Sequence, residues 1–265
     1  MLTSTRNPLI KRIRQLHRAK GRREQGLFLL EGTNLVEAAC QQRYRLAVVC
    51  ATEHWRSNHQ RLWAQLSDTV ERCEEVSEAV LEAIATTKSP DGVAAVAYRD
   101  SWAPPAEGTG RGPQVSLALE RLQDPGNLGT IIRVAAATAV TELFVSDDSV
   151  DLDHPKVLRA SAGQWFRVPL RSSPHLGDMI RDQKKRGIQV VATTPAANRT
   201  YWELDWRSPT LILLGNEGSG LSPELSVLAD TAVSIPQSPD VESLNVAMSA
   251  ALLLYEAQRQ YATNS

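Results

Sequence analysis

Residues of the kinds that perform chemistry gather in three short segments in the second half of this 265-residue chain. They are Asp124-Pro-Gly-Asn-Leu-Gly-Thr-Ile-Ile-Arg133, Leu214-Gly-Asn-Glu-Gly-Ser-Gly220 and Ser243-Leu-Asn-Val-Ala247. Each follows a run of residues typical of a buried strand, and the first and third lead into apolar helices. Open α/β sheets bind ligands at the carboxyl ends of their strands. The three segments therefore predict a ligand site at one sheet edge, and their polar side chains suggest an enzyme.

The first segment places an arginine shortly after a glycine-bearing turn. Pro125-Gly126 is typical of a sharp turn, and Gly129 allows the backbone to approach a ligand or a neighbouring strand closely. We expect a helix to begin near Ile131, which puts Arg133 in its first turn, where a cation opposes the helix dipole. A phosphate or a developing oxyanion explains an arginine there better than helix stability does. The asparagine and glycines of the segment, taken alone, fit plain turn chemistry equally well.

The second segment differs from two common nucleotide-binding loops. Its glycines follow the spacing G-x-x-G-x-G, which is not the Rossmann fingerprint, and no Gly-Lys-Ser/Thr follows as in a P-loop. Glu217 lies in its middle, and a carboxylate at a strand end among glycines can hold a hydroxyl, an amine or an arginine. A mobile glycine-rich loop would explain the glycines but leaves Glu217 unexplained.

The third segment leads into the most apolar helix of the chain. Ser243 fits a helix N-cap as well as it fits a catalytic role. The helix that follows is apolar nearly all round until Glu256. A surface helix has a polar face, so we expect this one to be buried or to form a subunit interface.

The rest of the composition narrows the class of protein. Three cysteines without CxxC spacing form no disulfide framework or zinc site, which favours a reducing cytosol. The five histidines are scattered without ligand spacing, no Gly-x-Ser-x-Gly elbow is present, and no apolar run is long enough for a membrane helix. We expect neither a metal site nor a hydrolase.

The start of the chain is strongly basic although the formal net charge is only −1. Between Arg6 and Arg23 there are eight lysines and arginines and no acid. Such a run could contact RNA or DNA phosphates, or it could be a solvated helix face. It resembles a mitochondrial presequence in composition. Leu9, Ile13 and Leu16 nevertheless follow one helical stripe, which indicates a helix of the folded protein.

A proline- and glycine-rich stretch at 100–113 predicts a linker, so we expect domains at 1–98 and 115–265 with a linker at 99–114. Both domains alternate strands and helices, as α/β folds do. Apolar runs without polar alternation predict a mostly parallel sheet, covered on both faces, in the second domain. Predicted strands lie at 27–30, 46–50, 93–97, 115–119, 142–146, 188–193, 209–214 and 231–235. Predicted helices lie near 8–20, 32–41, 55–66, 77–85, 130–139, 154–162, 175–186, 222–229 and 244–260.

The three segments resemble the three sequence motifs of the SpoU (TrmH) family, the RNA ribose 2'-O-methyltransferases of the SPOUT superfamily. Asn127, Gly129 and Arg133 match the first motif, and residues 215–218 and 243–246 match the second and third. The interior stretch 155–163 also resembles the family, so the likeness covers about 115–260. The first half resembles the family's small ribosomal-protein-like α/β substrate-binding domain, through residues 7–11 and 28–32. One departure is Thr138-Ala139-Val140, where the family usually has an aromatic-glycine pair.

The resemblance implies a fold, a cofactor and a partner. The second domain should be an α/β SPOUT domain with a deep trefoil knot, which is an exception to the rule that chains do not thread loops. S-adenosyl-L-methionine should bind in the knot, and two chains should pack there as a homodimer, which would cover the apolar last helix. The residues expected to bind the cofactor are Leu214, Gly215, Asn216, Gly218, Ile235 and Leu244.

The resemblance also implies the reaction, methyl transfer from a sulfonium to a ribose hydroxyl. Arg133 matches the family's catalytic arginine, which we expect to orient a phosphate and stabilise charge on the 2' oxygen, because arginine stays protonated. Ribosomal RNA is the favoured substrate, transfer RNA is the alternative, and a catalytically silent RNA-binding or ribosome-assembly protein is the alternative from another class. The protein should be cytoplasmic. Asn127, Glu217, Ser243 and Asn245 should complete the catalytic site, and Lys11, Arg12, Arg14 and Arg18 should contact RNA.

Overall fold

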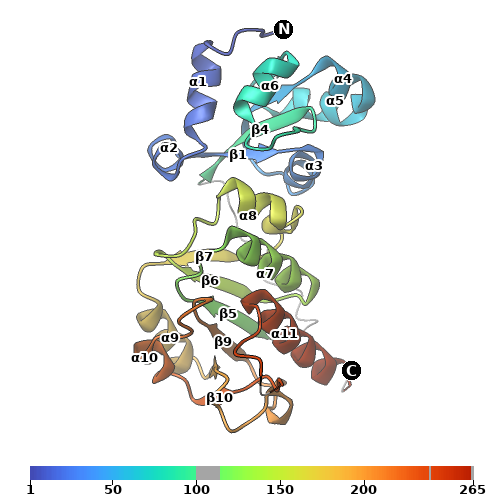
Figure 1. Cartoon of the computed structure of the whole chain (residues 1–265). Coiled ribbons are helices and arrows are strands. Elements are labelled where there is room, and N and C mark those ends of the chain that lie inside the picture. Colours follow the sequence, from blue (N-terminus) through green and yellow to red (C-terminus); the bar gives the residue numbers. More distant parts are fainter. Residues whose placement is uncertain (100–113, 239, 264–265) are drawn as a thin grey trace. The chain divides into compact units, whose positions relative to one another are not determined.

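The computed structural model describes residues 1–99, 114–238 and 240–263. The chain forms two compact units, Met1–Ala103 with Asp153–Phe166, and Pro104–Leu152 with Arg167–Ser265 (Figure 1). The first unit thus includes a stretch from the middle of the chain. The predicted linker stretch at 100–113 lies outside the described residues.

The first unit is built on a four-stranded sheet with the order β1-β4-β2-β3. Strands β1 and β2 run antiparallel to β4, and β3 runs parallel to β2. Helices α1 and α6 contribute Ile10, Ile13 and Ile84 to the core on this sheet. The bounds are β1 (Leu27–Glu31), β2 (Leu46–Ala51), β3 (Cys73–Glu75), β4 (Val93–Tyr98), α1 (Pro8–Gln15), α2 (Ala19–Gln25), α3 (Thr33–Gln41), α4 (Glu53–Asn58), α5 (Gln60–Thr69), α6 (Glu78–Ile84), α8 (Pro155–Ala160) and the 3-10 helix η2 (Gln164–Phe166).

The basic start of the chain is two helices, so the prediction of one helix over 8–20 is wrong. Arg22, on α2, explains much of the break because its Nη1 donates to the carbonyl oxygens of Leu16 (3.2 Å) and His17 (3.4 Å), just past the end of α1. The two helices also approach closely at Gly21, where a Cβ atom would lie 2.1 Å from the carbonyl oxygen of Gln15. Tertiary contacts therefore outweigh the continuous helical pattern.

Residues 153–166 pack on the first unit through charges and aromatic rings. Arg22 Nε donates to Asp153 Oδ1 at 3.0 Å, with both side chains almost fully buried. The ring centroids of Phe28 and Trp165 lie 5.4 Å apart, as expected for a packed aromatic pair. Arg159 Nη1 donates to Glu31 Oε1 at 3.1 Å. The first unit is therefore completed by residues far along the chain.

The second unit is a six-stranded sheet with the order β10-β8-β9-β5-β6-β7, and every neighbouring pair is parallel. The predicted parallel α/β fold of this part is confirmed, and all five residues of β9 are buried, as expected for a strand covered on both faces. The bounds are β5 (Val115–Leu119), β6 (Glu142–Ser146), β7 (Leu170–Ser173), β8 (Gln189–Thr193), β9 (Thr210–Leu214), β10 (Thr231–Val233), α7 (Pro125–Ala137), α9 (Leu176–Lys185), α10 (Pro223–Ser226), α11 (Val246–Ala262) and the 3-10 helix η3 (Tyr201–Glu203).

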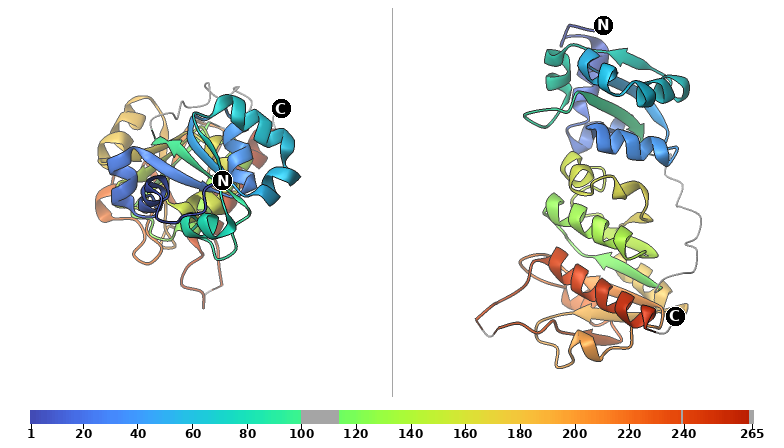
Figure 2. Two further views of the ribbon diagram at one scale, coloured as in Figure 1. Left: turned by 90° about the horizontal axis from the view of Figure 1, so that it is seen from above. Right: turned by 90° about the vertical axis from the view of Figure 1, so that its right-hand side faces the viewer.

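Helices cover this sheet from two sides. Helix α9 packs with Leu225 and Leu228 around α10 against one face, where Val190, Leu211 and Leu213 point. Helices α7 and α11 lie side by side on the other face (Figures 1 and 2). The sheet register aligns Leu119 with Leu214 at the carboxyl ends of β5 and β9. The segments that follow these two strands, the first two motifs, therefore leave the same sheet edge together.

Two strands were not predicted. Strands β3 and β7 are short and largely polar, and the apolar-run criterion cannot detect such edge strands. The described part of the chain contains no helix long and apolar enough to cross a membrane. The knot stays a prediction.

Candidate active site

The first motif opens a helix rather than a turn. Asp124 is the N-cap of α7, and its Oδ1 accepts from the backbone N–H of Gly126 (2.6 Å) and of Asn127 (2.9 Å), while Pro125 takes the first helical position. The predicted start at Ile131 is therefore wrong. The dipole argument for Arg133 is wrong for the same reason, because the dipole acts mainly within the first turn.

Arg133 instead lies well inside α7 and is exposed to solvent. No described residue forms a hydrogen bond or an ion pair with its guanidinium group. An exposed arginine without a partner keeps all of its N–H donors available to a ligand. The structure does not bring Arg133 into contact with the other four predicted catalytic residues within one chain.

Glu217, from the second motif, is held by neutral donors of the first motif. Its Oε1 accepts from the backbone N–H of Asp124 (3.0 Å) and from Asn127 Nδ2 (3.2 Å), and its Oε2 accepts from the backbone N–H of Gln123 (3.2 Å). Asn216 Nδ2 donates to the carbonyl oxygen of Arg121 at 2.8 Å. The two motifs are thus joined by hydrogen bonds at the sheet edge.

These donors set the ionisation of Glu217. Burial raises the pKa of its carboxyl group, but the backbone N–H groups of Asp124 and Gln123 and the amide of Asn127 lower the pKa by more, so it lies below its ordinary value. The carboxylate is therefore ionised at neutral pH. None of these donors carries a positive charge, so the negative charge of Glu217 is not neutralised within the site.

The third motif joins the same network through Asn245. Asn245 Nδ2 donates to Asn127 Oδ1 at 2.9 Å. Asn245 is also the N-cap of α11, since its Oδ1 accepts from the backbone N–H of Ala247 (2.9 Å) and Met248 (3.4 Å). The alternative that Ser243 caps the last helix is therefore wrong. A chain of hydrogen bonds from Glu217 through Asn127 to Asn245 connects all three motifs.

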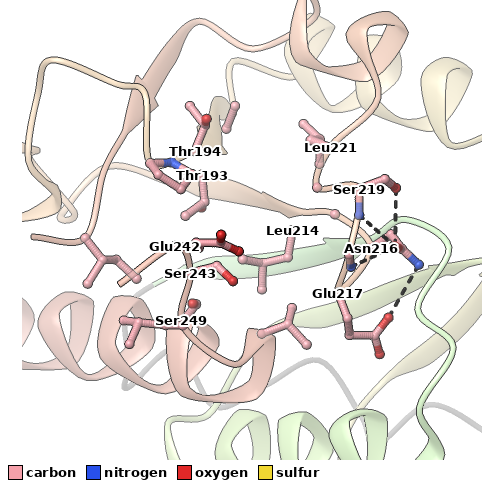
Figure 3. A pocket seen from close by; sticks show the side chains of 18 of the residues that line it. Thr193, Thr194, Leu214, Asn216, Glu217, Ser219, Leu221, Glu242, Ser243 and Ser249 are labelled. Carbon is pink, nitrogen blue, oxygen red and sulfur yellow. Dashed lines mark hydrogen bonds between the residues drawn. The ribbon is translucent and has the colours of Figure 1, made fainter. Parts of the chain in front are cut away.

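A cavity of about 420 Å³ lies beside this network (Figure 3). The loops after β8, β9 and β10 and the start of α11 form its walls. Gly215 is required by the close packing of this loop, because a Cβ atom would lie 2.1 Å from the backbone nitrogen of Leu221. Two predicted catalytic residues, Glu217 and Ser243, line the cavity, and so do all six residues predicted to bind the cofactor, namely Leu214, Gly215, Asn216, Gly218, Ile235 and Leu244.

Sequence reasoning missed part of this lining. Thr193, Thr194 and Pro195 line the cavity at the end of β8, and Glu242 and Ser249 line it from either side of the third motif. The sequence did contain a signal for the first three, because the strand predicted at 188–193 ends there and parallel strands present their carboxyl ends at one edge.

The residues predicted to contact RNA lie on the first unit. Lys11, Arg14 and Arg18 line a hollow of about 450 Å³ together with His17 and Lys20. Arg12 is exposed on α1 but outside the lining. Across the described residues, no group of three or more His, Cys, Asp and Glu side chains could hold a metal ion.

Comparisons with known proteins cover both halves of the chain. The model of the SpoU rRNA Methylase family matches residues 114–255, and that of the MRM3-like substrate binding domain matches residues 7–95. A Synechocystis relative named as a tRNA/rRNA methyltransferase is 44% identical over 98% of this chain and 93% of its own length. The Bacillus subtilis 23S rRNA (guanosine(2553)-2'-O)-methyltransferase RlmP is 30% identical over 96% of this chain and 97% of its own length. The crystal structure of an AdoMet-bound rRNA methyltransferase from Sinorhizobium meliloti has a TM-score of 0.85 and 32% identity, covering 97% of each chain.

Proposed function

Since the chain belongs to the SpoU rRNA methylase family, we propose that it methylates ribosomal RNA. It is an S-adenosylmethionine-dependent RNA ribose 2'-O-methyltransferase, and so an enzyme rather than a silent scaffold. The choice of ribosomal RNA rests on one observation. The B. subtilis 23S rRNA enzyme resembles the chain across both units, including the substrate-binding unit. Transfer RNA remains the alternative substrate, in line with the double name of the Synechocystis relative.

The basic hollow of the first unit supports an RNA phosphate contact. The side chains of Lys11, Arg12, Arg14 and Arg18 form no hydrogen bond or ion pair with any described residue, so their charges are available to a partner. Glu24 is the one acid among the residues that line the hollow. Lysine and arginine contacts to phosphates supply most sequence-independent affinity, and they position RNA without reading its bases.

The cavity of the second unit fits S-adenosylmethionine. Its volume lies within the range of small-molecule sites. Leu214, Ile235 and Leu244 give it apolar walls suited to an adenosine, while the loop backbone at Gly215 and Gly218 offers polar groups. The charged side chains of the lining are both carboxylates, Glu217 and Glu242, which suits a cationic ligand. We propose that the six predicted cofactor residues hold it largely through backbone groups.

The reaction needs a ribose hydroxyl, a poor nucleophile, to attack a methyl group. S-adenosylmethionine supplies that methyl group in electrophilic form, on a sulfonium. Arg133 has no hydrogen-bond or ion-pair partner among the described residues, so we assign it to orient the target phosphate and to stabilise negative charge on the 2' oxygen. Glu217 and Asn245 fix the amide of Asn127 from both sides, so its orientation is set before RNA binds. Ser243, on the cavity wall, completes the proposed site.

The exposed face of α11 supports a homodimer. Met248, Leu252 and Tyr255 are 50%, 40% and 56% exposed, and their spacing puts them on one face of the helix. An exposed apolar stripe of this kind is typical of a subunit interface. We therefore propose that two chains pack through α11, and that the protein works in the cytoplasm, where its RNA substrate is found.

Mapping of ribose methylation tests the substrate. Total RNA from cells with and without the gene is mapped for 2'-O-methyl positions. We expect one ribosomal RNA position to lose its mark without the gene, and to regain it with the wild-type chain but not with Arg133→Lys. If a 2'-O-methyl group is lost from transfer RNA while ribosomal RNA methylation is unchanged, the ribosomal RNA proposal is wrong and transfer RNA is the substrate.

A further inference from the structure

The cofactor cavity contains one carboxylate that the catalytic network does not use. Of the two acidic side chains in its lining, Glu217 accepts hydrogen bonds on both oxygens, from Asp124 and Asn127 of the first motif and from Gln123 just before it. Glu242 lines the same cavity directly before the third motif, and no described residue forms a hydrogen bond or an ion pair with it. Figure 3 shows its side chain beside Ser243, with the carboxylate directed into the space between the labelled residues.

An unpaired carboxylate in the lining of a ligand cavity favours a cationic ligand. The lining includes no lysine or arginine, so no charge of the cavity itself balances Glu242. A carboxylate would repel an RNA phosphate, which argues against a role towards the substrate backbone. A sulfonium is a compact cation without N–H or O–H donors, and an unpaired carboxylate can attract it by charge alone.

We propose that Glu242 is the counter-ion of the sulfonium and makes the cavity prefer S-adenosylmethionine over S-adenosylhomocysteine. The ammonium and the carboxylate of the amino-acid tail are present in both ligands, so the sulfonium charge is the difference between them. In methyl transfer the C–S bonding pair stays on sulfur, which becomes a neutral thioether. The new C–O bond forms from a lone pair of the 2' oxygen, whose proton passes to solvent.

This preference would assist both the binding of S-adenosylmethionine before the reaction and the release of S-adenosylhomocysteine after it. Before transfer, the attraction between Glu242 and the sulfonium holds the methyl donor in the cavity. After transfer that attraction is gone, so the product is bound less tightly than the donor. Because Glu242 is exposed and screened by water, we expect a moderate effect, about a two- to fivefold difference in dissociation constant for one charge pair.

Calorimetry with both ligands tests the proposal without RNA. We compare the wild-type chain, Glu242→Gln, which removes the charge at nearly constant shape, and Glu242→Asp, which keeps the charge. Glu224→Gln is the matched control, because Glu224 lies on α10 of the same unit and does not line the cavity. Thermal unfolding without ligand checks that each variant is folded.

We expect Glu242→Gln to bind S-adenosylmethionine about two- to fivefold more weakly, with the affinity for S-adenosylhomocysteine almost unchanged. Glu242→Asp and Glu224→Gln should keep most of the wild-type preference. An equal loss for both ligands would show a contact to the shared tail, and no loss would show an ordinary surface carboxylate, and either result overturns the proposal. Failure of the ribosomal RNA proposal would appear only in the methylation map, so the two results are distinguishable.

Discussion

Arg22 of the first unit and Arg133 of the second both lie on helices and have opposite surroundings. Arg22 is 1% exposed, and its donors are used by Asp153 and by two carbonyl oxygens at the end of α1. Arg133 is exposed and has no partner among the described residues. The same side chain is therefore structural where the protein satisfies its donors and available for chemistry where it does not.

The carboxylates of the two regions differ in a related way. Asp153 is held by two arginines, Arg22 at 3.0 Å and Arg99 at 2.5 Å, so its charge is compensated within the unit. Glu217 is held by amides and backbone N–H groups, so its charge is kept. The charge of Asp153 is thus neutralised where it is buried, while the charge of Glu217 is oriented without being neutralised.

The largest effect is expected from a substitution that breaks the buried ion pair between Arg22 and Asp153. Asp153→Ala removes the buried carboxylate that Arg22 contacts at 3.0 Å, which should lower the free energy of unfolding by about 3–5 kcal/mol. Urea unfolding followed by tryptophan fluorescence measures it. Asp178→Ala, which removes the partner of Arg181 in an exposed ion pair, is the control, with an expected loss of about 0–1 kcal/mol. Equal losses in the two variants would show that the Asp153 pair is not structural.

The second effect is on catalysis and should leave the fold intact. Arg133→Lys keeps the charge but not the planar fork of donors, so single-turnover methylation should slow by about 100-fold, or about 2.7 kcal/mol in the barrier. RNA affinity and the unfolding transition should change little. Arg181→Lys, on the exposed surface of α9, is the control. Near-normal methylation by Arg133→Lys would show that Arg133 does not have the proposed catalytic role.

A smaller effect should follow from the exposed part of the basic run. Reversing Arg12, Arg14 and Arg18 to glutamate should weaken RNA binding by about tenfold and reduce the slope of log affinity against log salt by about 2. Cofactor affinity should not change. The control reverses three exposed cations of the other unit, Arg181 and Lys185 on α9 and Arg186 at its C-cap. Unchanged RNA affinity would show that these three arginines do not contact RNA and form only a solvated helix face.

The smallest effect concerns pH and Glu217. Because its folded pKa lies below the ordinary value, the carboxylate contributes stability above the unfolded pKa, and that contribution is lost as pH falls through the folded pKa. The unfolding free energy of the wild-type chain minus that of Glu217→Gln should therefore shrink by about 1 kcal/mol between neutral and acid pH. A pH-independent difference would show that Glu217 is not ionised in its network.

The buried apolar strands of the fold could be predicted from the sequence, whereas the polar edge strands and the start of α7 could not. Buried runs such as 115–119 and 210–214 were found because strands covered on both faces leave a continuous apolar signal. Polar edge strands such as β3 leave none. The start of α7 was missed because Pro125-Gly126 has turn chemistry locally, while the Asp124 side chain and the first-turn position of proline make the same residues helical.

The candidate site shows the same division. The three motifs were found from their residue types, from their positions after apolar strands and from their order along the chain. The sequence did not reveal that Glu217, Asn127 and Asn245 form one chain of hydrogen bonds, since the contacting residues are separated by 90 and 118 positions. It also missed Glu242, which has no distinctive local pattern.

By itself the sequence determined the class of fold and the family and predicted a set of catalytic and binding residues, because these depend on local apolar patterns and on short motifs. Only the tertiary structure decided which of the many arginines are available. Arg22 and Arg14 belong to the same basic run, yet one is buried against Asp153 and the other is exposed. Whether a charge is paired depends on groups far apart in the chain, and folding alone brings them together.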